Sequence, residues 1–275
     1  MKKVLTLILP LAFIFGCDDD DSDTMRPIQC FVSEAVVTYP STEVEIADTK
    51  EKYVASHTDT YTTLDVYETD DTGNFPSEPD RSIIFTFDAT DNTRIVEIRH
   101  IGSDPTTYTL EEYSYLNEGS VLKQVSEIIN EEVVFERSFT IHLPPQNING
   151  MYVTRNVNNE DVLHVFENNN LTKIGYRSED GDVTFENRKW HISTVYEYDD
   201  KPNASKDIVI AMLTWGIDSP VRFSKNNVIR ETTIQSDGTS ITVENPATYS
   251  QDGKVMSYDV ESVQRRLTIE YDCQQ

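Results

Sequence analysis

Near its end the chain reads Leu267-Thr268-Ile269-Glu270-Tyr271-Asp272-Cys273, with apolar residues or cysteine at odd positions and polar residues at even positions. Successive side chains of a β-strand point to opposite faces of the sheet. The alternation therefore predicts a strand whose odd-numbered residues face the protein core, and it places Cys273 on that inward face.

The same alternation recurs along most of the chain and predicts an all-β fold, built as an extended antiparallel meander. Short polar turns separate the predicted strands, so neighbours are expected to pair as hairpins. The chain also contains 14 tyrosines, a residue type that favours strands. Strands are expected at 27–39, 61–67, 83–87, 94–101, 106–115, 121–129, 133–142, 162–166, 171–177, 183–186, 228–235, 240–244, 254–260 and 266–273.

One segment departs from the alternation. From Ile208 to Trp215, apolar residues recur with the spacing of one helix face. Ser205 can cap the start of a helix and Gly216 follows its last apolar residue, so a short helix is predicted within 205–215. The alternative is a buried strand from Ile208 to Leu213.

A break in the meander is expected at 143–150. Pro144 and Pro145 cannot donate the hydrogen bonds of a strand ladder, and Gly150 relaxes the backbone. This segment is either a boundary between two subdomains or a long turn within one domain.

The N-terminus has the anatomy of an export signal. Lys2 and Lys3 precede an apolar segment of about a dozen residues, too short to span a bilayer. The residues Ile14-Phe15-Gly16-Cys17 resemble the lipobox of bacterial lipoproteins. That resemblance implies a signal peptide at 1–16 and a covalent lipid on Cys17, with no other cofactor expected. The alternative is an ordinary secretion signal followed by an incidental cysteine.

Aspartates fill positions 18 to 21, directly after Cys17. An acidic run at this place resembles the export signal of surface lipoproteins in Bacteroidota, which implies a location on the cell surface at the outer membrane. The run is also typical of a solvated, disordered tether at 17–26, and the two interpretations are compatible. The folded domain is then expected at 27–275.

The two remaining cysteines lie in the first and last predicted strands. In Ile28-Gln29-Cys30-Phe31-Val32, Cys30 shares a face with Ile28 and Val32. An exported compartment permits oxidation, so we predict a disulfide between Cys30 and Cys273. The alternative is a pair of buried free thiols.

Charge and motifs exclude several classes of function. The net charge of −25 repels phosphate backbones and anionic lipid headgroups, so nucleic acid is not an expected partner. The lipid anchor alone would therefore hold the protein at the membrane. The sequence contains no G-x-S-x-G, H-E-x-x-H, Walker or G-x-G-x-x-G motif. We therefore predict that the protein is not an enzyme.

Ligand-binding candidates are few. Trp190 and Trp215 could form a platform on which sugars stack, although large aromatic side chains in β proteins more often fill the core. The loops at 70–74 and 179–182 concentrate oxygen ligands, but neither matches an EF-hand, so solvated turns are expected and no metal site is predicted. The 5 histidines lie far apart in the sequence and are not expected to be ligands.

A loose repeat places an aromatic residue before an acidic or amide turn. It occurs at Phe85-Thr-Phe87-Asp88, Tyr113-Ser-Tyr115-Leu-Asn117-Glu-Gly119, Val165-Phe166-Glu-Asn168, Tyr196-Glu-Tyr198-Asp199 and Tyr249-Ser-Gln-Asp252-Gly253-Lys254. Such turns suit hairpins because Asp, Asn and Gly tolerate positive φ angles. These segments resemble the YD-type repeats of Rhs-like β proteins, which implies hairpins of this kind throughout the domain.

The tail of the chain, about the last 80 residues, is also similar to a group of uncharacterised Bacteroidota lipoproteins. The residues that carry the similarity are Tyr196-Glu-Tyr198-Asp-Asp-Lys201-Pro202-Asn203, Lys225-Asn226-Asn227-Val228 and Tyr271-Asp-Cys273. The similarity implies an extended antiparallel sheet on an outer-membrane anchor and no established activity.

Three functions of different class remain open. The first, which we favour, is a lipid-anchored, non-catalytic binding or structural lipoprotein of the bacterial outer membrane, exposed at the cell surface or in the periplasm, with a glycan or another surface protein as partner. The second is a surface carbohydrate-active hydrolase with a carboxylate pair, which requires a carboxyl group of raised pKa beside an ionised one. The third is a calcium-stabilised adhesion domain.

Overall fold

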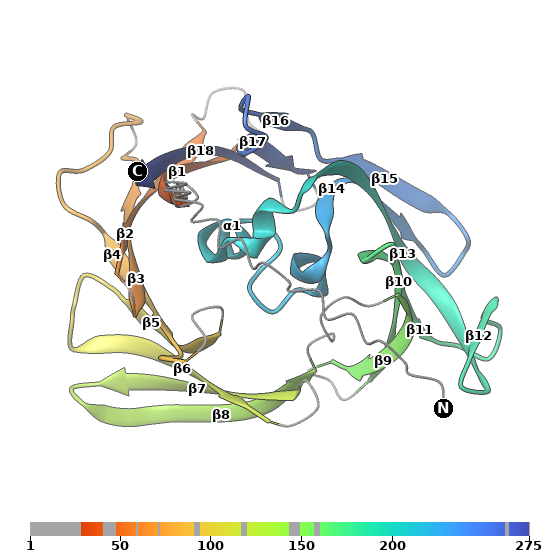
Figure 1. Ribbon diagram of the computed structural model, residues 1–275. Coiled ribbons are helices and arrows are strands. Elements are labelled where there is room, and N and C mark those ends of the chain that lie inside the picture. Colours follow the sequence, from red (N-terminus) through yellow and green to blue (C-terminus); the bar gives the residue numbers. More distant parts are fainter. Residues whose placement is uncertain are drawn as a thin grey trace, which may run out of the picture.

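The computed structural model describes residues 29–40, 48–58, 60–70, 72–90, 94–116, 120–142, 149–156, 160–261 and 264–274. They form two antiparallel β-sheets with a short helical segment between them (Figure 1). The all-β prediction is confirmed. The signal peptide at 1–16, Cys17 and the tether at 17–26 lie outside the described residues.

The first sheet has 11 strands in the order β16-β17-β18-β1-β2-β3-β4-β5-β6-β7-β8. From β1 to β8 the spatial order follows the chain order, so the predicted meander is present. The last strands of the chain join the other side of β1. The strands are β1 (Gln29–Tyr39), β2 (Thr49–His57), β3 (Tyr61–Glu68), β4 (Arg81–Phe87), β5 (Ile95–Ile101), β6 (Thr107–Tyr115), β7 (Ser120–Ile129), β8 (Glu132–His142), β16 (Ala247–Tyr249), β17 (Val255–Val260) and β18 (Arg265–Gln274).

The second sheet has 7 strands in the order β15-β14-β13-β11-β10-β9, with β12 paired to β13. The chain enters this sheet between His142 and Gly150, where the prolines predicted a break, and it returns to the first sheet at β16. The strands are β9 (Gly150–Arg155), β10 (Asp161–Glu167), β11 (Asn170–Arg177), β12 (Val183–Phe185), β13 (Arg188–Pro202), β14 (Asn226–Ile234) and β15 (Ser240–Glu244).

The turn predicted at Tyr196-Glu-Tyr198-Asp199 is wrong. These residues lie inside β13, which continues beside β14 with irregular register between Tyr198 and Pro202. The strand continues because the Asp199 carboxylate accepts a hydrogen bond from the backbone N–H of Asn227, 3.0 Å away on the neighbouring strand. Turns do occur at Asn168–Asn169, where both residues have positive φ.

The predicted helix is present, and the alternative of a buried strand is wrong. Helix α1 (Ile208–Leu213) follows a 3-10 turn, η2 (Ala204–Lys206). Its cap is Asp207 rather than Ser205, because the Asp207 carboxylate accepts from the backbone N–H groups of the first turn. Gly216, with φ of +90°, follows the helix. No helix among the described residues is long and apolar enough to cross a bilayer.

Helix α1 is buried on nearly all sides. Ile208, Val209, Ile210, Ala211 and Leu213 are all buried, as expected for a helix that is hydrophobic all round. In Figure 1 the helix lies between the two sheets, and a second 3-10 turn, η3 (Pro220–Phe223), lies beside it. Residues 203–224, which we call the inner segment, therefore fill the space that the curved sheets leave between them.

Three apolar clusters hold these layers together. The largest joins the inward face of the first sheet to α1 and includes Phe85, Ile98, Val209, Tyr258 and Leu267. The second joins the second sheet to η3 and comprises Phe166, Leu171, Tyr196, Val221 and Val228. The third lies within the second sheet and comprises Leu163, Val165, Trp190 and Ile192. The inner segment thus contributes to the cores of both sheets.

Cys30 and Cys273 lie directly opposite each other on β1 and β18 and are disulfide bonded. The predicted disulfide is confirmed, and the alternative of two free thiols is wrong. Cys273 is exposed, however, so its predicted inward position is wrong. It continues the face of Leu267 and Ile269, which are buried, but it lies at the end of the strand beyond the core.

We expect the Cys30→Ser variant to unfold at clearly lower denaturant concentration than the wild type. The disulfide closes a sequence separation of 243 residues, and a loop of that length corresponds to roughly 5 kcal/mol of unfolded-state entropy, an upper figure. Urea unfolding of the oxidised wild type, the reduced wild type and both serine variants measures the effect. A difference below about 0.5 kcal/mol would contradict it.

His164 is a buried histidine in β10 without a charged partner in the described structure. Its Nε2 lies 2.9 Å from Thr154 Oγ1, and its ring stacks on Tyr152 with centroids 5.2 Å apart. Burial lowers the pKa of His164 from 6.5 to about 4. Because the unfolded chain binds the proton more tightly, folded-state stability is fully present above pH 6.5 and is lost as pH falls towards 4.

We expect this loss to reach about 3 kcal/mol between pH 6.5 and pH 4. The measurement is the free energy of unfolding of the wild type and of His164→Gln across that range. Carboxyl groups titrate in both proteins, so the difference between the two curves isolates His164. Parallel curves would show that His164 does not lose its proton on folding.

Candidate functional site

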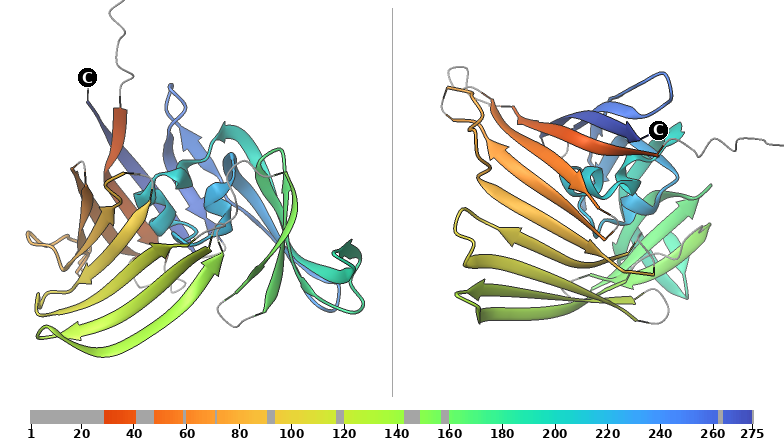
Figure 2. Two further views of the ribbon diagram at one scale, coloured as in Figure 1. Left: turned by 60° about the horizontal axis from the view of Figure 1, so that its bottom comes forward. Right: turned by 60° about the vertical axis from the view of Figure 1, so that its left-hand side comes forward.

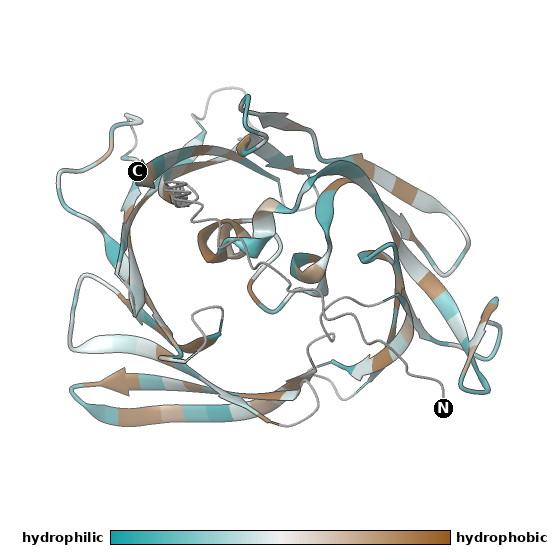
Figure 3. Cartoon of the chain, in the orientation of Figure 1, coloured by the Kyte–Doolittle hydropathy of each residue, from teal (hydrophilic) through white to brown (hydrophobic). Residues whose placement is uncertain are grey.

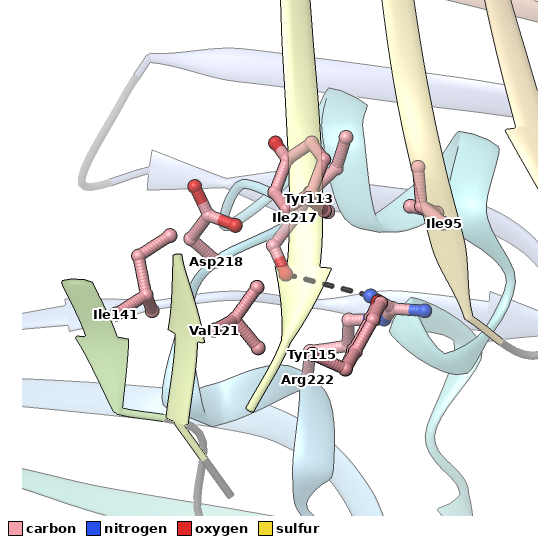
Figure 4. Close-up of a pocket in the computed structure, with 8 residues that line it drawn as sticks. All are labelled: Ile95, Tyr113, Tyr115, Val121, Ile141, Ile217, Asp218 and Arg222. Atoms are coloured by element: carbon pink, nitrogen blue, oxygen red, sulfur yellow. Dashed lines mark hydrogen bonds between the residues drawn. The ribbon is translucent and has the colours of Figure 1, made fainter. Parts of the chain in front are cut away.

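A small cavity opens between the first sheet and the inner segment. It has a volume of about 20 Å³ and is lined by Ile95, Tyr113, Tyr115, Val121, Ile141, Ile217, Asp218 and Arg222 (Figure 4). A buried water molecule needs about 10–15 Å³, so the cavity is large enough for one water molecule. Its polar groups come from both walls, which makes this contact the first candidate for a functional site.

An ion-pair network crosses this contact. Lys123 Nζ lies 2.9 Å from Glu111 Oε2 and 2.9 Å from Asp218 Oδ2. Lys123 and Tyr113 are opposite each other on β7 and β6, while Asp218 belongs to the inner segment. The Tyr113 hydroxyl donates to Glu111 Oε2 at 2.7 Å. We call Glu111, Tyr113, Lys123 and Asp218 the interior ionic cluster.

Burial and charge oppose each other in the interior ionic cluster. Burial raises the pKa of Glu111, but the Lys123 ammonium and the Tyr113 hydroxyl outweigh it and leave that pKa lowered. Burial likewise lowers the pKa of Lys123, but Asp218 and Glu111 outweigh it and leave that pKa raised. Glu111 and Lys123 are therefore both charged near neutral pH, and Glu111 lacks the raised pKa that a general acid requires.

Arg222 lies next to this cluster on the wall of the cavity (Figure 4). Its Nη1 donates to the backbone carbonyl of Ile217 at 3.5 Å. Burial lowers the pKa of Arg222, and the hydroxyl of Tyr115 and the carboxylate of Asp218 oppose that effect. The guanidinium thus stabilises the turn before η3 from the inside.

The carboxyl group of Asp207, unlike that of Glu111, has a raised pKa because of burial. Asp207 Oδ1 accepts from the backbone N–H of Val209 at 2.8 Å and from that of Ile210 at 3.3 Å. These hydrogen bonds oppose the effect of burial and occupy the carboxylate as a helix cap. Asp207 consequently has a structural task at the start of α1.

Buried asparagines join the two ends of the inner segment to each other and attach the segment to the second sheet. Asn203 Nδ2 donates to the backbone carbonyls of Val221, Arg222 and Ser224, at 3.1, 3.3 and 3.0 Å. Asn227 Oδ1 accepts from the backbone N–H of Ala204 at 2.7 Å. Asn203 and Asn227 are 5% and 1% exposed, so these bonds lie away from water. We call this group the asparagine hub.

The asparagine hub is built from the residues that carry the similarity to the Bacteroidota lipoproteins. Asn227 Nδ2 donates to Asp199 Oδ2 and to the carbonyl of Pro202, and the Tyr249 hydroxyl donates to Asp199. The sequence predicted turn chemistry here and missed this convergence. The available signal was the pair of asparagine motifs on either side of the predicted helix.

The structure does not bring Trp190 and Trp215 together. Trp190 is fully buried in the third apolar cluster, and its indole N–H donates to the carbonyl of Phe185 at 3.3 Å. Trp215 is half-buried and packs edge-on against Tyr196, with centroids 6.3 Å apart. Trp190 therefore presents no ring face at the surface on which a sugar could stack.

The Asp70 carboxylate accepts hydrogen bonds from within its own loop. Asp70 Oδ1 accepts from the backbone N–H groups of Thr72 and Asn74, each at 2.9 Å. These bonds are those of a solvated turn, as predicted. Within the described ranges, no group of three or more His, Cys, Asp or Glu side chains is arranged to hold a metal ion.

We expect Lys123→Met to destabilise the protein by about 1–3 kcal/mol, because it leaves the Glu111 and Asp218 carboxylates, whose side chains are 20% and 35% exposed, without their shared cation. The measurement is urea unfolding at pH 7. Lys173→Met is the matched control, since Lys173 is 42% exposed and its Nζ lies 3.9 Å from Glu167. The control should change stability by less than about 0.5 kcal/mol, and equal effects of the two variants would refute the prediction.

Comparisons with known proteins assign no family. No protein-family model matches the chain, and no curated protein matches it. Among solved structures, the chain is similar to a porin-like protein from Bacteroides uniformis, with 8% sequence identity and a TM-score of 0.33. The match covers 88% of this chain and 98% of that chain. A similarity of this level establishes neither a shared fold nor a shared function.

Proposed function

We propose that the protein is a lipid-anchored, non-catalytic binding or structural lipoprotein on the outer surface of the bacterial outer membrane. The observation that carries the proposal is the N-terminal sequence, in which a basic start and an apolar segment lead to Cys17 and then to the run of aspartates at 18–21. Two acyl chains on Cys17 suffice for stable anchoring. The Cys30–Cys273 disulfide is in keeping with an oxidising compartment outside the cytosol.

The geometry of the charged groups favours a non-catalytic role. A glycoside hydrolase requires one carboxyl group of raised pKa beside an ionised carboxylate. Glu111 has a lowered pKa because of Lys123 and Tyr113, which offset its burial, and Asp207 is engaged as a helix cap. Glu111 and Asp218 share the Lys123 ammonium, and Asp207 caps the start of α1.

An anchor on Cys17 would orient the domain. About a dozen residues separate Cys17 from the start of β1, and they reach at most about 40 Å. The first sheet begins there, so the end that carries Thr58 and Asp88 would lie nearer the membrane. The opposite end, which carries Thr69, Gly102 and Asn130, would face outward.

The test is intact-mass spectrometry of the protein extracted from membranes with detergent. We expect a chain that begins at Cys17 and carries the added mass of acyl chains. Cys17→Ala should abolish the added mass and release the protein from the membrane fraction. Asp18→Asn combined with Asp19→Asn, Asp20→Asn and Asp21→Asn should keep the lipid but reduce labelling by an impermeant surface reagent.

An unmodified chain that begins at Met1 in the soluble fraction would overturn both the anchor and the compartment. Equal surface labelling of the aspartate variant and the wild type would overturn only the role of the acidic run. Hydrolysis of a surface polysaccharide by the purified protein would overturn the non-catalytic assignment.

A further inference from the structure

The hairpin of β7 and β8 exposes apolar side chains at its tip. Val133, Val134 and Phe135 on β8 are 57%, 54% and 46% exposed, and Ile129 on β7 is 42% exposed. Figure 3 shows hydrophobic residues on both strands near this tip. Such residues are normal when scattered singly, whereas here four of them gather at the tip of one hairpin.

The outer edge of β8 presents backbone N–H and C=O groups with which a further strand could pair. Among the described residues, β8 is the last strand of the first sheet and pairs with β7 and with no other strand. In both views of Figure 2, no other strand lies along the tip half of its outer edge. β8 has 11 residues, whereas the edge strands β15 and β16 have 5 and 3. Natural sheets usually keep edges short or place lysines on them, so a long apolar edge is an available site for an added strand.

The charges around this edge are predominantly acidic. The exposed side chains of Glu127, Glu131, Glu132 and Glu136 surround the apolar tip. The guanidinium of Arg137 lies 5.9 Å from the centre of the Phe139 ring. A second copy of this chain would bring the same acidic groups against one another, on a molecule with a net charge of −25. Charge complementarity therefore favours a basic partner.

The tip also lies away from the start of the domain. Because β1 to β8 run antiparallel in chain order, the turn at 130–131 is at the end of the sheet opposite to Gln29. A tether that leads from Cys17 to Gln29 would leave this end free to meet another molecule.

We propose that the outer edge of β8 binds an extended segment of another protein in which apolar residues alternate with lysine or arginine. The segment adds a strand to the first sheet, so its backbone pairs with the open edge of β8. The register shift between Val133 and Phe135 puts these two side chains on opposite faces of the sheet. The apolar side chains of the segment therefore cover Phe135, and its basic side chains meet Glu136 on the other face. The proposal identifies the partner class of the proposed binding function, and it depends on neither the lipid nor the compartment.

The test uses the full-length protein in detergent and a fluorescent peptide of about ten residues that alternates lysine with valine, long enough for one strand. Fluorescence anisotropy measures binding. We expect a peptide that alternates glutamate with valine to bind at least about tenfold more weakly, since it repels the acidic edge. The lysine–valine peptide with an N-methyl group on every residue should also bind more weakly, because neither of its edges can donate.

The variant Val133→Lys with Phe135→Lys should weaken binding of the lysine–valine peptide by about tenfold or more. Ile241→Lys is the matched control, since Ile241 is 55% exposed on another edge strand, and it should leave binding unchanged. In the wild type, hydrogen exchange of the β8 amides should slow when the peptide is bound, a readout that needs no variant.

Several results would overturn the proposal. Equal binding of the lysine–valine and glutamate–valine peptides would remove the charge argument, and unchanged hydrogen exchange in β8 would remove the strand-addition argument. A stable dimer that is broken by the β8 variant would assign the edge to a second copy instead. None of these results bears on acylation of Cys17, which intact-mass spectrometry reads independently.

Discussion

Two curved sheets with apolar inward faces cannot be stable unless something fills the space between them, and the inner segment at 203–224 meets that requirement. Helix α1 is buried on nearly every side and packs into the core of the first sheet, while Val221 of η3 packs into the core of the second. A polar chain in this place would leave both cores exposed to water. The architecture therefore depends on one helix of 6 residues and the turns around it.

Apolar packing alone does not set the position of the inner segment, because hydrophobic contact is non-directional. Direction comes from polar contacts at its two sides. The interior ionic cluster fixes Asp218 to the first sheet through Lys123. The asparagine hub joins Asn203 to Ser224 within the inner segment and fixes Ala204 to Asn227 of the second sheet. Buried polar groups of this kind are stable only when their partners are all in place, so they specify one arrangement of the layers.

The same arrangement explains why the exposed edge of β8 differs from the rest of the first sheet. The strands from β1 to β6 have a neighbour on each side and an inward face that is covered. β8 has one neighbour, and residues 132–138 are all exposed. The apolar side chains of residues 133–135 are thus not explained by the core, and the proposed binding segment would account for them.

Local pattern by itself determined most of the strands, the existence of the helix and the pairing of Cys30 with Cys273, because alternation and helical spacing are properties of neighbouring residues. It did not determine the long strand β13 or the partners of Asp199, since those depend on Asn227 and Tyr249. Lys123 and Asp218 are separated by 95 residues, and only the folded chain brings their charges within 2.9 Å. The edge position of β8 is likewise set by the tertiary structure. It depends on where the chain leaves the first sheet, because the last strand before that point has no second neighbour.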